Sequence, residues 1–202
     1  MLLQKVIEQK KTKAGEMIGL VGTHRGAGVT HTGLMIAFYF GEELGKKTAF
    51  LELNDHHDMS LLQSVYEWSK EDEISFSYHQ ITFYKNVTRN ILAELRSEDY
   101  DCYILDFGAE CKTIWDEFLR CGTKIVIGNQ VDWNRVKLEQ FMGYVQTIKG
   151  SNTWLHLIPY ATQKTINKLR SELERLIYSV PLEVDPMILS KDTIRLFDEL
   201  FH

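Results

Sequence analysis

Short apolar runs alternate along the chain with longer segments in which apolar residues recur at helical spacing. Several of these runs are apolar at nearly every position, which is typical of strands buried on both faces of a parallel sheet. The predicted strands are Met17–Val21, Thr48–Leu53, Cys102–Phe107, Thr123–Gly128, Thr153–Ile158 and Ile177–Val180. The alternating, β-rich segment Ser75–Tyr84 predicts one or two further strands at an edge.

Helical patterns lie between the strands. Thr30–Leu44 is apolar on almost every side, which predicts a helix packed between the sheet and other elements. The other predicted helices are Val87–Arg96, Trp133–Ile148, Lys164–Leu176 and Lys191–Phe201. Strands joined by single helices imply right-handed βαβ units. The pattern therefore predicts an α/β fold, a three-layer α/β/α sandwich with a mostly parallel sheet, which binds ligands at the carboxyl ends of its strands.

The composition fits one globular domain. The chain has 202 residues, of which 44% are hydrophobic and 25% charged, enough for one sizeable core. Its net charge of −5 argues against a nucleic-acid surface. The three cysteines match no zinc pattern, so we expect reduced thiols in a cytoplasmic protein. No apolar run approaches the ~18 residues that span a bilayer, which argues against membrane insertion.

Both ends of the chain carry amphipathic segments. We expect residues 1–16 to form an N-terminal extension ahead of a single domain, residues 17–202. The extension has no apolar core of signal-peptide length, which argues against export. The polar face of Lys191–Phe201 is acidic, so we expect this helix to pack on the core rather than on anionic lipid.

A glycine-rich turn, GTHRGAGVTHT, covers Gly22 to Thr32 between the first strand and the first helix. Backbone N–H groups of such a turn, together with the helix N-terminus, can hold a phosphate group. In the phosphate-loop pattern G-x-x-x-x-G-K-[ST], Gly28 and Thr30 fit, whereas the first glycine is Thr23 and the lysine is Val29. A loop that keeps its backbone and loses its cation indicates a nucleotide site with weak or absent hydrolysis.

Acidic residues end two of the predicted strands. The segment YDCYILDFG places Asp106 at a carboxyl end, where an aspartate can orient magnesium while the loop hydroxyl of Thr30 holds it directly. A surface carboxylate is the alternative interpretation of Asp106. The strand in KKTAFLELND ends in Glu52, a weak candidate for positioning an attacking water.

With these motifs the chain resembles the MinD/ParA-type, deviant Walker A (SIMIBI class) P-loop ATPases. Within that family it is most similar to the divergent CpaE/TadZ-like pilus-assembly and localisation proteins. The resemblance runs from Met17 to the C-terminus. It rests on the loop, LELND, YDCYILDFG and the final stretch SVPLEVDPMILSKDTIRLFDELF.

The resemblance implies a P-loop NTPase fold and a site with both lysines replaced. The lysine that reaches across the family's dimer interface falls on His24, beside Arg25, and the loop lysine falls on Val29. The implied nucleotide-binding residues are His24, Arg25, Gly26, Ala27, Gly28, Val29, Thr30 and His31. Loss of two charged hydrogen bonds could weaken phosphate binding by about two to four orders of magnitude.

The remaining positions are mixed. The family's water-activating aspartate falls on Glu52, while the metal-binding pair is kept as Thr30 and Asp106. Where the family usually has an asparagine for adenine, this chain reads LIPYAT, with Pro159 and Tyr160.

Together these features predict a degenerate, non-hydrolysing nucleotide-binding protein that acts as an assembly or localisation factor, for example of a pilus or secretion machine. Its expected cofactor is ATP or ADP with magnesium. Its expected partners are a second copy, through the P-loop face, and a protein of the machine. Two alternatives stay open: an active ATPase that uses His24 or Arg25 in place of lysine, and a partner-binding module that no longer binds nucleotide.

Overall fold

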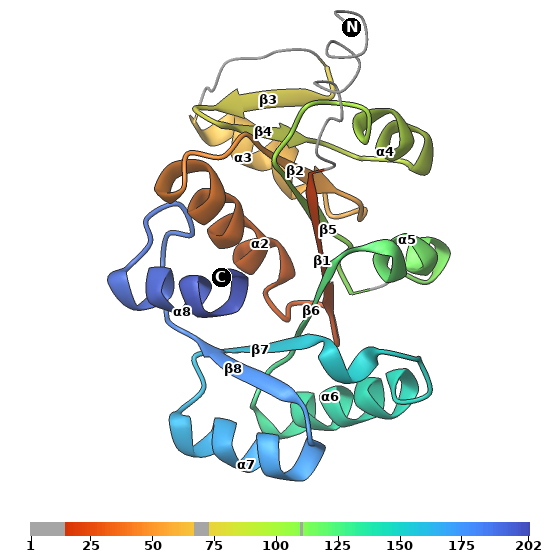
Figure 1. Cartoon of the computed structure of the whole chain (residues 1–202), viewed down its shortest axis with the longest axis vertical. Helices are drawn as coiled ribbons and strands as arrows, with labels where there is room; N and C mark the ends of the chain where they lie inside the picture. Colours follow the sequence, from red (N-terminus) through yellow and green to blue (C-terminus); the bar gives the residue numbers. More distant parts are fainter. Residues whose placement is uncertain (1–14, 67–72, 110) are drawn as a thin grey trace, which may run out of the picture.

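The computed structural model describes residues 15–66, 73–109 and 111–202, so nearly all of the predicted N-terminal extension lies outside the described residues. Eight strands form one sheet in the order β3-β4-β2-β5-β1-β6-β7-β8, parallel except for β3 (Figure 1). The strands are β1 Glu16–Gly22, β2 Thr48–Glu52, β3 Ser75–Tyr78, β4 Ile81–Tyr84, β5 Cys102–Asp106, β6 Thr123–Ile127, β7 Leu155–Pro159 and β8 Leu176–Val180. All the predicted strands are confirmed, with ends that differ by at most two residues.

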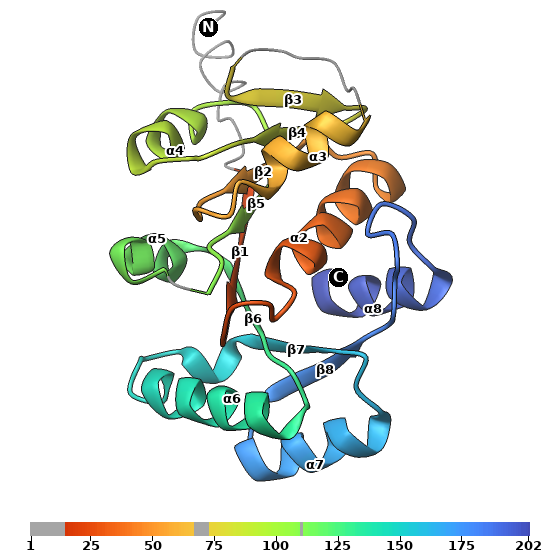
Figure 2. The same cartoon turned by 180° about the vertical axis from the view of Figure 1, so that it is seen from behind.

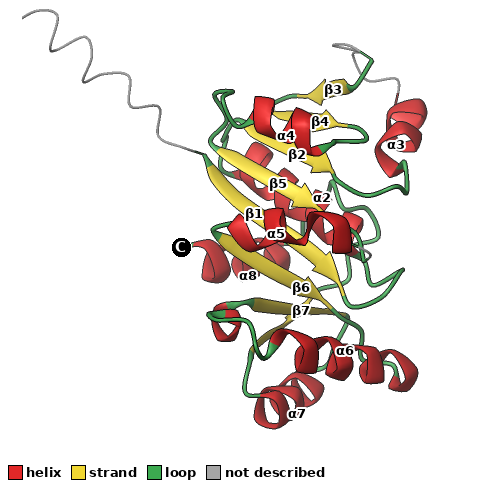
Figure 3. Ribbon diagram, turned by 90° about the vertical axis from the view of Figure 1, so that its right-hand side faces the viewer, coloured by secondary structure: helices red, strands yellow, loops and turns green. Residues whose placement is uncertain are grey.

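Helices cover both faces of the sheet. The apolar residues of α2 (Val29–Phe38), α3 (Asp58–Tyr66) and α8 (Lys191–Phe201) pack with Phe50 and Ile104 on one face. On the other face, α4 (Arg89–Leu95) and α5 (Trp115–Arg120) pack with Leu51 and Leu105. There, α6 (Asp132–Val145) also packs against α7 (Gln163–Leu173). Figure 3 shows α4 and α5 in front of the sheet and α2 and α8 behind it, which confirms the three-layer sandwich.

Two of the predictions need correction, and two short helices were not predicted. The segment Ser75–Tyr84 is an antiparallel hairpin, and its second strand, β4, lies inside the sheet beside β2. The helix expected to reach Leu176 ends at Leu173, because Glu174 adopts a left-handed backbone (φ 51°) and β8 follows at once. The short helices α3 and α5 were not predicted, and of the residues in α3 only Met59 is buried.

The first helix continues past α2 as a π-helical turn, Tyr39–Glu43, and meets the C-terminal helix there. The ring of Tyr39, which is fully buried, lies 5.5 Å from that of Phe197 in an edge-on contact. Both views of the fold show α8 beside α2 (Figures 1 and 2). The expectation that Lys191–Phe201 packs on the core is therefore confirmed, and no described helix is long and apolar enough to cross a membrane.

A single hydroxyl joins these two helices and offers a test of the packing. The Tyr39 hydroxyl donates a hydrogen bond of 2.7 Å to Oδ1 of Asp198. We expect Tyr39→Phe to lower the free energy of unfolding by about 1 kcal/mol, since the ring stays and only the bond is lost. Urea unfolding of Tyr39→Phe, of Asp198→Ala and of the double variant checks this. Additive losses in the double variant would contradict a direct bond.

The register of the central strands sets the position of the site. Leu20 of β1 pairs with Asp106 of β5, and Asp106 pairs with Glu52 of β2. On the other side of β1, Gly22 pairs with Ile127 of β6. The glycine-rich turn and both strand-end carboxylates therefore lie at one edge of the sheet.

Candidate functional site

The turn between β1 and α2 wraps around the strand ends and is held by backbone hydrogen bonds. The N–H of Gly22 donates to the carbonyl of Gly108, and that of Thr23 donates to Ile127. Gly26 and Gly28 have φ values of 79° and 97°, a left-handed region that residues with a Cβ rarely adopt. The two glycines therefore make this tight turn possible.

The turn leaves its donors open. Across the described residues, the N–H groups of Gly26, Gly28, Val29 and Thr30 donate to no protein acceptor, and no side chain caps α2. A pocket of 260 Å³ lies above them, lined by residues 24–31 with His56, Asp58 and Gly108 among others. Unpaired amides at a helix N-terminus attract an anion through their hydrogen bonds and the helix dipole.

Thr30 and Asp106, which the sequence paired, lie in direct contact. The Thr30 hydroxyl donates to Oδ2 of Asp106 at 2.7 Å and lies 3.4 Å from Oδ2 of Asp58. The N–H of Gly108 donates to the other oxygen of Asp106 at 2.9 Å. Burial raises the pKa of Asp106 to about 6, against the lowering effect of these two hydrogen bonds. Asp58, at the start of α3, is a second carboxylate at the Thr30 hydroxyl.

Glu52 has a different environment from the one expected. It is 1% exposed. Its Oε1 accepts the N–H of Met59 at 3.2 Å and its Oε2 accepts that of Asn86 at 3.4 Å. The carboxylate thus fixes the start of α3 and the chain after β4, which any catalytic role would have to interrupt. A role for Glu52 in positioning water stays a prediction.

The polar side chains around the loop differ in how they are held. His24 contacts the Thr23 hydroxyl at 2.9 Å, and burial, followed by the charge of Lys137, lowers its pKa. The buried Nε2 of His31 has no hydrogen-bond partner within the described chain. Arg25 is exposed and forms no ion pair with any described residue. Arg25 is therefore a cation at the loop without a carboxylate partner there.

Two further pockets flank the loop along the same edge of the sheet. A pocket of 320 Å³ lies on the β2–β5 side, and Arg25 and Ala109 line both it and the loop pocket. On the β7–β8 side a small pocket of 90 Å³ is lined by Asn129, Pro159 and Tyr160 together with the loop. Asn129, which follows β6, was missed by the sequence reasoning although its strand-end position was a usable signal.

No protein-family model matches the sequence, and no curated protein is similar to it in sequence. Solved structures do match. MinD of Aquifex aeolicus is 14% identical with a TM-score of 0.67, covering 92% of this chain and 98% of that one. In the MinC:MinD complex of that organism, the matching chain is 13% identical with a TM-score of 0.69, covering 92% and 96%.

Two more solved structures carry nucleotides. A plasmid partition protein of Borrelia burgdorferi bound to AMPPNP has a TM-score of 0.66 at 12% identity, covering 93% of this chain and 97% of its own. MinD of Pyrococcus horikoshii with Mg-ADP has a TM-score of 0.62 at 12% identity, covering 84% and 82%. The fold is that of the MinD/ParA P-loop proteins. At these identities the likeness establishes the fold alone.

In this fold the residues present suit a magnesium-bound phosphate. Thr30, Asp58 and Asp106 offer only oxygen donors, which magnesium prefers, and the open amides suit phosphate oxygens. Among the described residues no group of three or more histidines, cysteines and carboxylates could hold a metal without help. Magnesium usually takes one or two carboxylates from a protein and completes its shell with water and phosphate, which the pair Asp58 and Asp106 could supply.

Proposed function

We propose that this chain is a MinD/ParA-like nucleotide-binding protein that holds ATP or ADP and hydrolyses it weakly or not at all. The observation that carries the proposal is the set of open N–H groups of Gly26, Gly28, Val29 and Thr30 above the Thr30–Asp106 pair. These groups would hold the phosphates, and the oxygens of Thr30 and Asp106 would hold magnesium, which neutralises phosphate charge when it is bound.

Weak hydrolysis is proposed because the charge that this chemistry requires is missing. Val29 occupies the lysine position, is 7% exposed, and packs beneath the turn against Gly22. Stabilisation of developing charge supplies most of the rate in phosphoryl transfer, and an aliphatic side chain supplies none. Both oxygens of the Glu52 carboxylate accept backbone N–H groups, which also disfavours hydrolysis because the carboxylate is not free to position a water molecule.

The proposed biological role is that of a cytoplasmic assembly or localisation factor, for instance in a pilus or secretion machine. The CpaE/TadZ-like resemblance of the sequence supports it, and so does the existence of a MinC:MinD complex among proteins of the same fold. A homodimer through the P-loop face, with His24 and Arg25 at the contact, belongs to the same proposal.

One observation favours the second candidate, an active ATPase. Arg25 lines both the loop pocket and the pocket on the β2–β5 side and forms no ion pair with a described carboxylate. A guanidinium in this place could supply charge to a bound phosphate, although from the turn rather than from the first residue of α2. The third candidate is a partner-binding module that no longer binds nucleotide. It would keep the fold, and water would bind the open amides of the turn.

Calorimetric titration with ATP and ADP, with and without magnesium, together with a phosphate-release assay, distinguishes the three candidates. We expect both nucleotides to bind. We also expect Thr30→Val, which keeps the side-chain shape, to weaken the binding of Mg·ATP about tenfold while leaving magnesium-free binding within twofold. No heat from either nucleotide at millimolar concentration would select the nucleotide-free module. Steady turnover that Asp106→Ala abolishes would select the active ATPase.

A further inference from the structure

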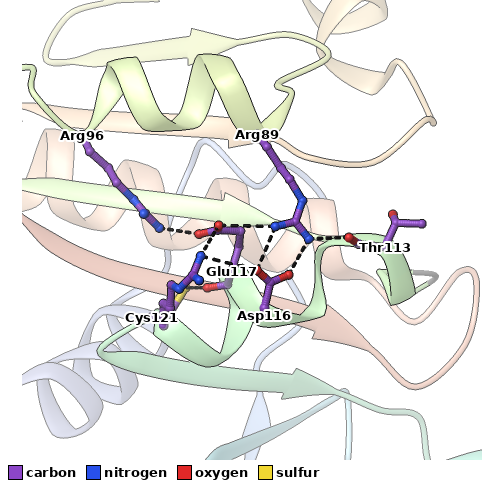
Figure 4. A network of polar contacts seen from close by, with 7 residues as sticks. Arg89, Arg96, Thr113, Asp116, Glu117 and Cys121 are labelled. Carbon is purple, nitrogen blue, oxygen red and sulfur yellow. Dashed lines mark hydrogen bonds and ion pairs between the residues drawn. The ribbon is translucent and has the colours of Figure 1, made fainter.

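An ion-pair network joins α4 to α5 (Figure 4). It lies beside the pocket on the β2–β5 side of the loop, which Thr113 and Ile114 line. We call it the α4–α5 network; its members are Arg89, Arg96, Asp116, Glu117 and Arg120. Glu117 is the buried member, 6% exposed, and its carboxylate pairs with Arg96 at 2.6 Å and with Arg89 at 3.6 Å. The network fixes α5 against α4.

Arg89 has a contact that the other arginines lack. Its Nη1 donates to Oδ2 of Asp116 at 2.8 Å, and its Nη2 donates both to Oδ1 of Asp116 and to the backbone carbonyl of Thr113. Thr113 belongs to the turn Lys112–Ile114, which is closed by a 3.0 Å bond from the Ile114 N–H to the Cys111 carbonyl. Arg89 thus holds the backbone of the chain that follows β5.

The residues just before Arg89 hold the chain that follows β2. The N–H of Val87 donates to the Glu52 carbonyl at 2.8 Å, and the N–H of Asn86 donates to the Glu52 carboxylate. The side chains of Asn86 and His57 contact each other, and both residues have left-handed backbones, with φ values of 52° and 59°. Three of the four residues from Asn86 to Arg89 therefore contact one or other of the strand-end segments.

Those two segments are the walls of the 320 Å³ pocket. Residues 53–56 line one side, and Phe107, Ala109, Thr113 and Ile114 line the other. Ala109 and Gly108 also line the loop pocket, next to Asp106. Arg25, His56 and Ala109 line both pockets, so the end of a phosphate chain held by the loop would lie next to these walls.

We propose that the segment Asn86–Arg89 is a strut that sets the spacing of the two walls, with Arg89 as the positioning residue for the wall at Thr113. The inference rests on the proposed function for its link to nucleotide, but the strut itself is a property of the chain alone. The strut couples the position of α4 to the spacing of the walls. A shift of α4 would therefore change how a terminal phosphate fits, and binding of that phosphate would shift α4.

Position 89 requires arginine because its side chain contacts two acceptors at once, the Asp116 carboxylate and the Thr113 carbonyl. Its planar guanidinium reaches a carboxylate and a carbonyl at once, whereas lysine presents one compact charge. The hydrogen bonds from Arg89 hold the pKa of Asp116 at about 2, so the pair stays ionised across the physiological range. Both side chains are nearly half exposed, at 44% and 47%, so salt should weaken the contact.

Arg120 offers a matched control. It pairs with the same two acids, Asp116 at 3.4 Å and Glu117 at 2.5 Å, and makes no contact with Thr113 among the interactions of the described chain. Hydrogen exchange of the full-length protein without nucleotide measures the strut. We expect the Ile114 amide to exchange at least about fivefold faster in Arg89→Ala and in Arg89→Lys, and within twofold of the native rate in Arg120→Ala. Equal acceleration in Arg120→Ala, or none in the Arg89 variants, would overturn the strut.

Titration with ATP and with ADP then tests the link to phosphate. We expect Arg89→Lys to weaken ATP binding about fivefold more than ADP binding, while Arg120→Ala leaves the ratio unchanged. An equal loss for both nucleotides in Arg89→Lys would overturn the placement of the terminal phosphate at these walls. If the native protein binds neither nucleotide, the proposed function fails, and the exchange measurement still decides whether the strut exists.

Discussion

Replacing Val29 by lysine is expected to tighten the binding of Mg·ATP by about 10- to 150-fold, the equivalent of one hydrogen bond to a charged group. The reason lies in the geometry of the turn. Its amides are open and its helix N-terminus is uncapped, so the backbone half of the phosphate site is already formed. Only the cation is missing. Calorimetric titration of the native protein and of Val29→Lys measures the gain.

The control for this variant is Val29→Met, which is close to lysine in length and carries no charge. Val29 is buried beneath the turn, so any longer side chain must leave this position and lie over the loop. If Val29→Met tightens binding as much as Val29→Lys, the effect comes from the shape of the turn. If neither variant changes the affinity, the turn does not hold phosphate in the way proposed.

The parts of the fold that were predictable share one property: a single local rule determines them. Strands such as β1 and β5 are apolar at nearly every position because both their faces are buried, and that signal is visible in the sequence. The turn at Gly26 and Gly28 was also predictable from the sequence, since a left-handed backbone conformation favours glycine. The position of Asp106 beside the turn was predictable from these two features, because the carboxyl ends of parallel strands lie at one edge of the sheet.

The features that the sequence did not predict are ones that only tertiary contacts determine. The carboxylate of Glu52, for which water positioning stays a prediction, accepts the N–H of Met59, at the start of a helix that the sequence did not predict. That helix, α3, has one buried residue and a weak apolar pattern, so periodicity could not find it. Likewise α5 is short, six residues, and depends on partners such as Arg89 that lie far from it in the sequence.

Charge explains why the site is open to ligands. In an ordinary phosphate loop the lysine balances the carboxylates around the metal, and here Asp106 and Asp58 flank Thr30 with no lysine in the loop. A buried carboxylate without a cation raises the free energy of the folded protein, and a bound magnesium ion would lower it. If magnesium binds as proposed, it would therefore stabilise this site more than one whose loop carries a lysine.

The free-energy cost of burying the ionised Asp106 carboxylate leads to the second prediction. We expect Asp106→Asn to raise the free energy of unfolding at pH 7.5, in the absence of magnesium, by up to about 3 kcal/mol. Burial raises the pKa of Asp106 from 3.8 to about 6 in the folded protein, so the folded state prefers the protonated carboxyl. Asparagine stays neutral, and it can still accept the N–H of Gly108 and contact the Thr30 hydroxyl.

The pH dependence has a definite sign and can be checked by urea unfolding of both proteins between pH 3.5 and 8 in EDTA. A carboxyl with a raised folded pKa stabilises the fold while it is protonated, and that stability is lost as the pH rises from about 4 to about 6. The advantage of Asp106→Asn should therefore appear across this window, stay constant above it and vanish below it. Asp99→Asn, at an exposed position, should show no such window. Magnesium should stabilise the native protein and leave Asp106→Asn unchanged; an advantage that is independent of pH would show that Asp106 is ionised without cost.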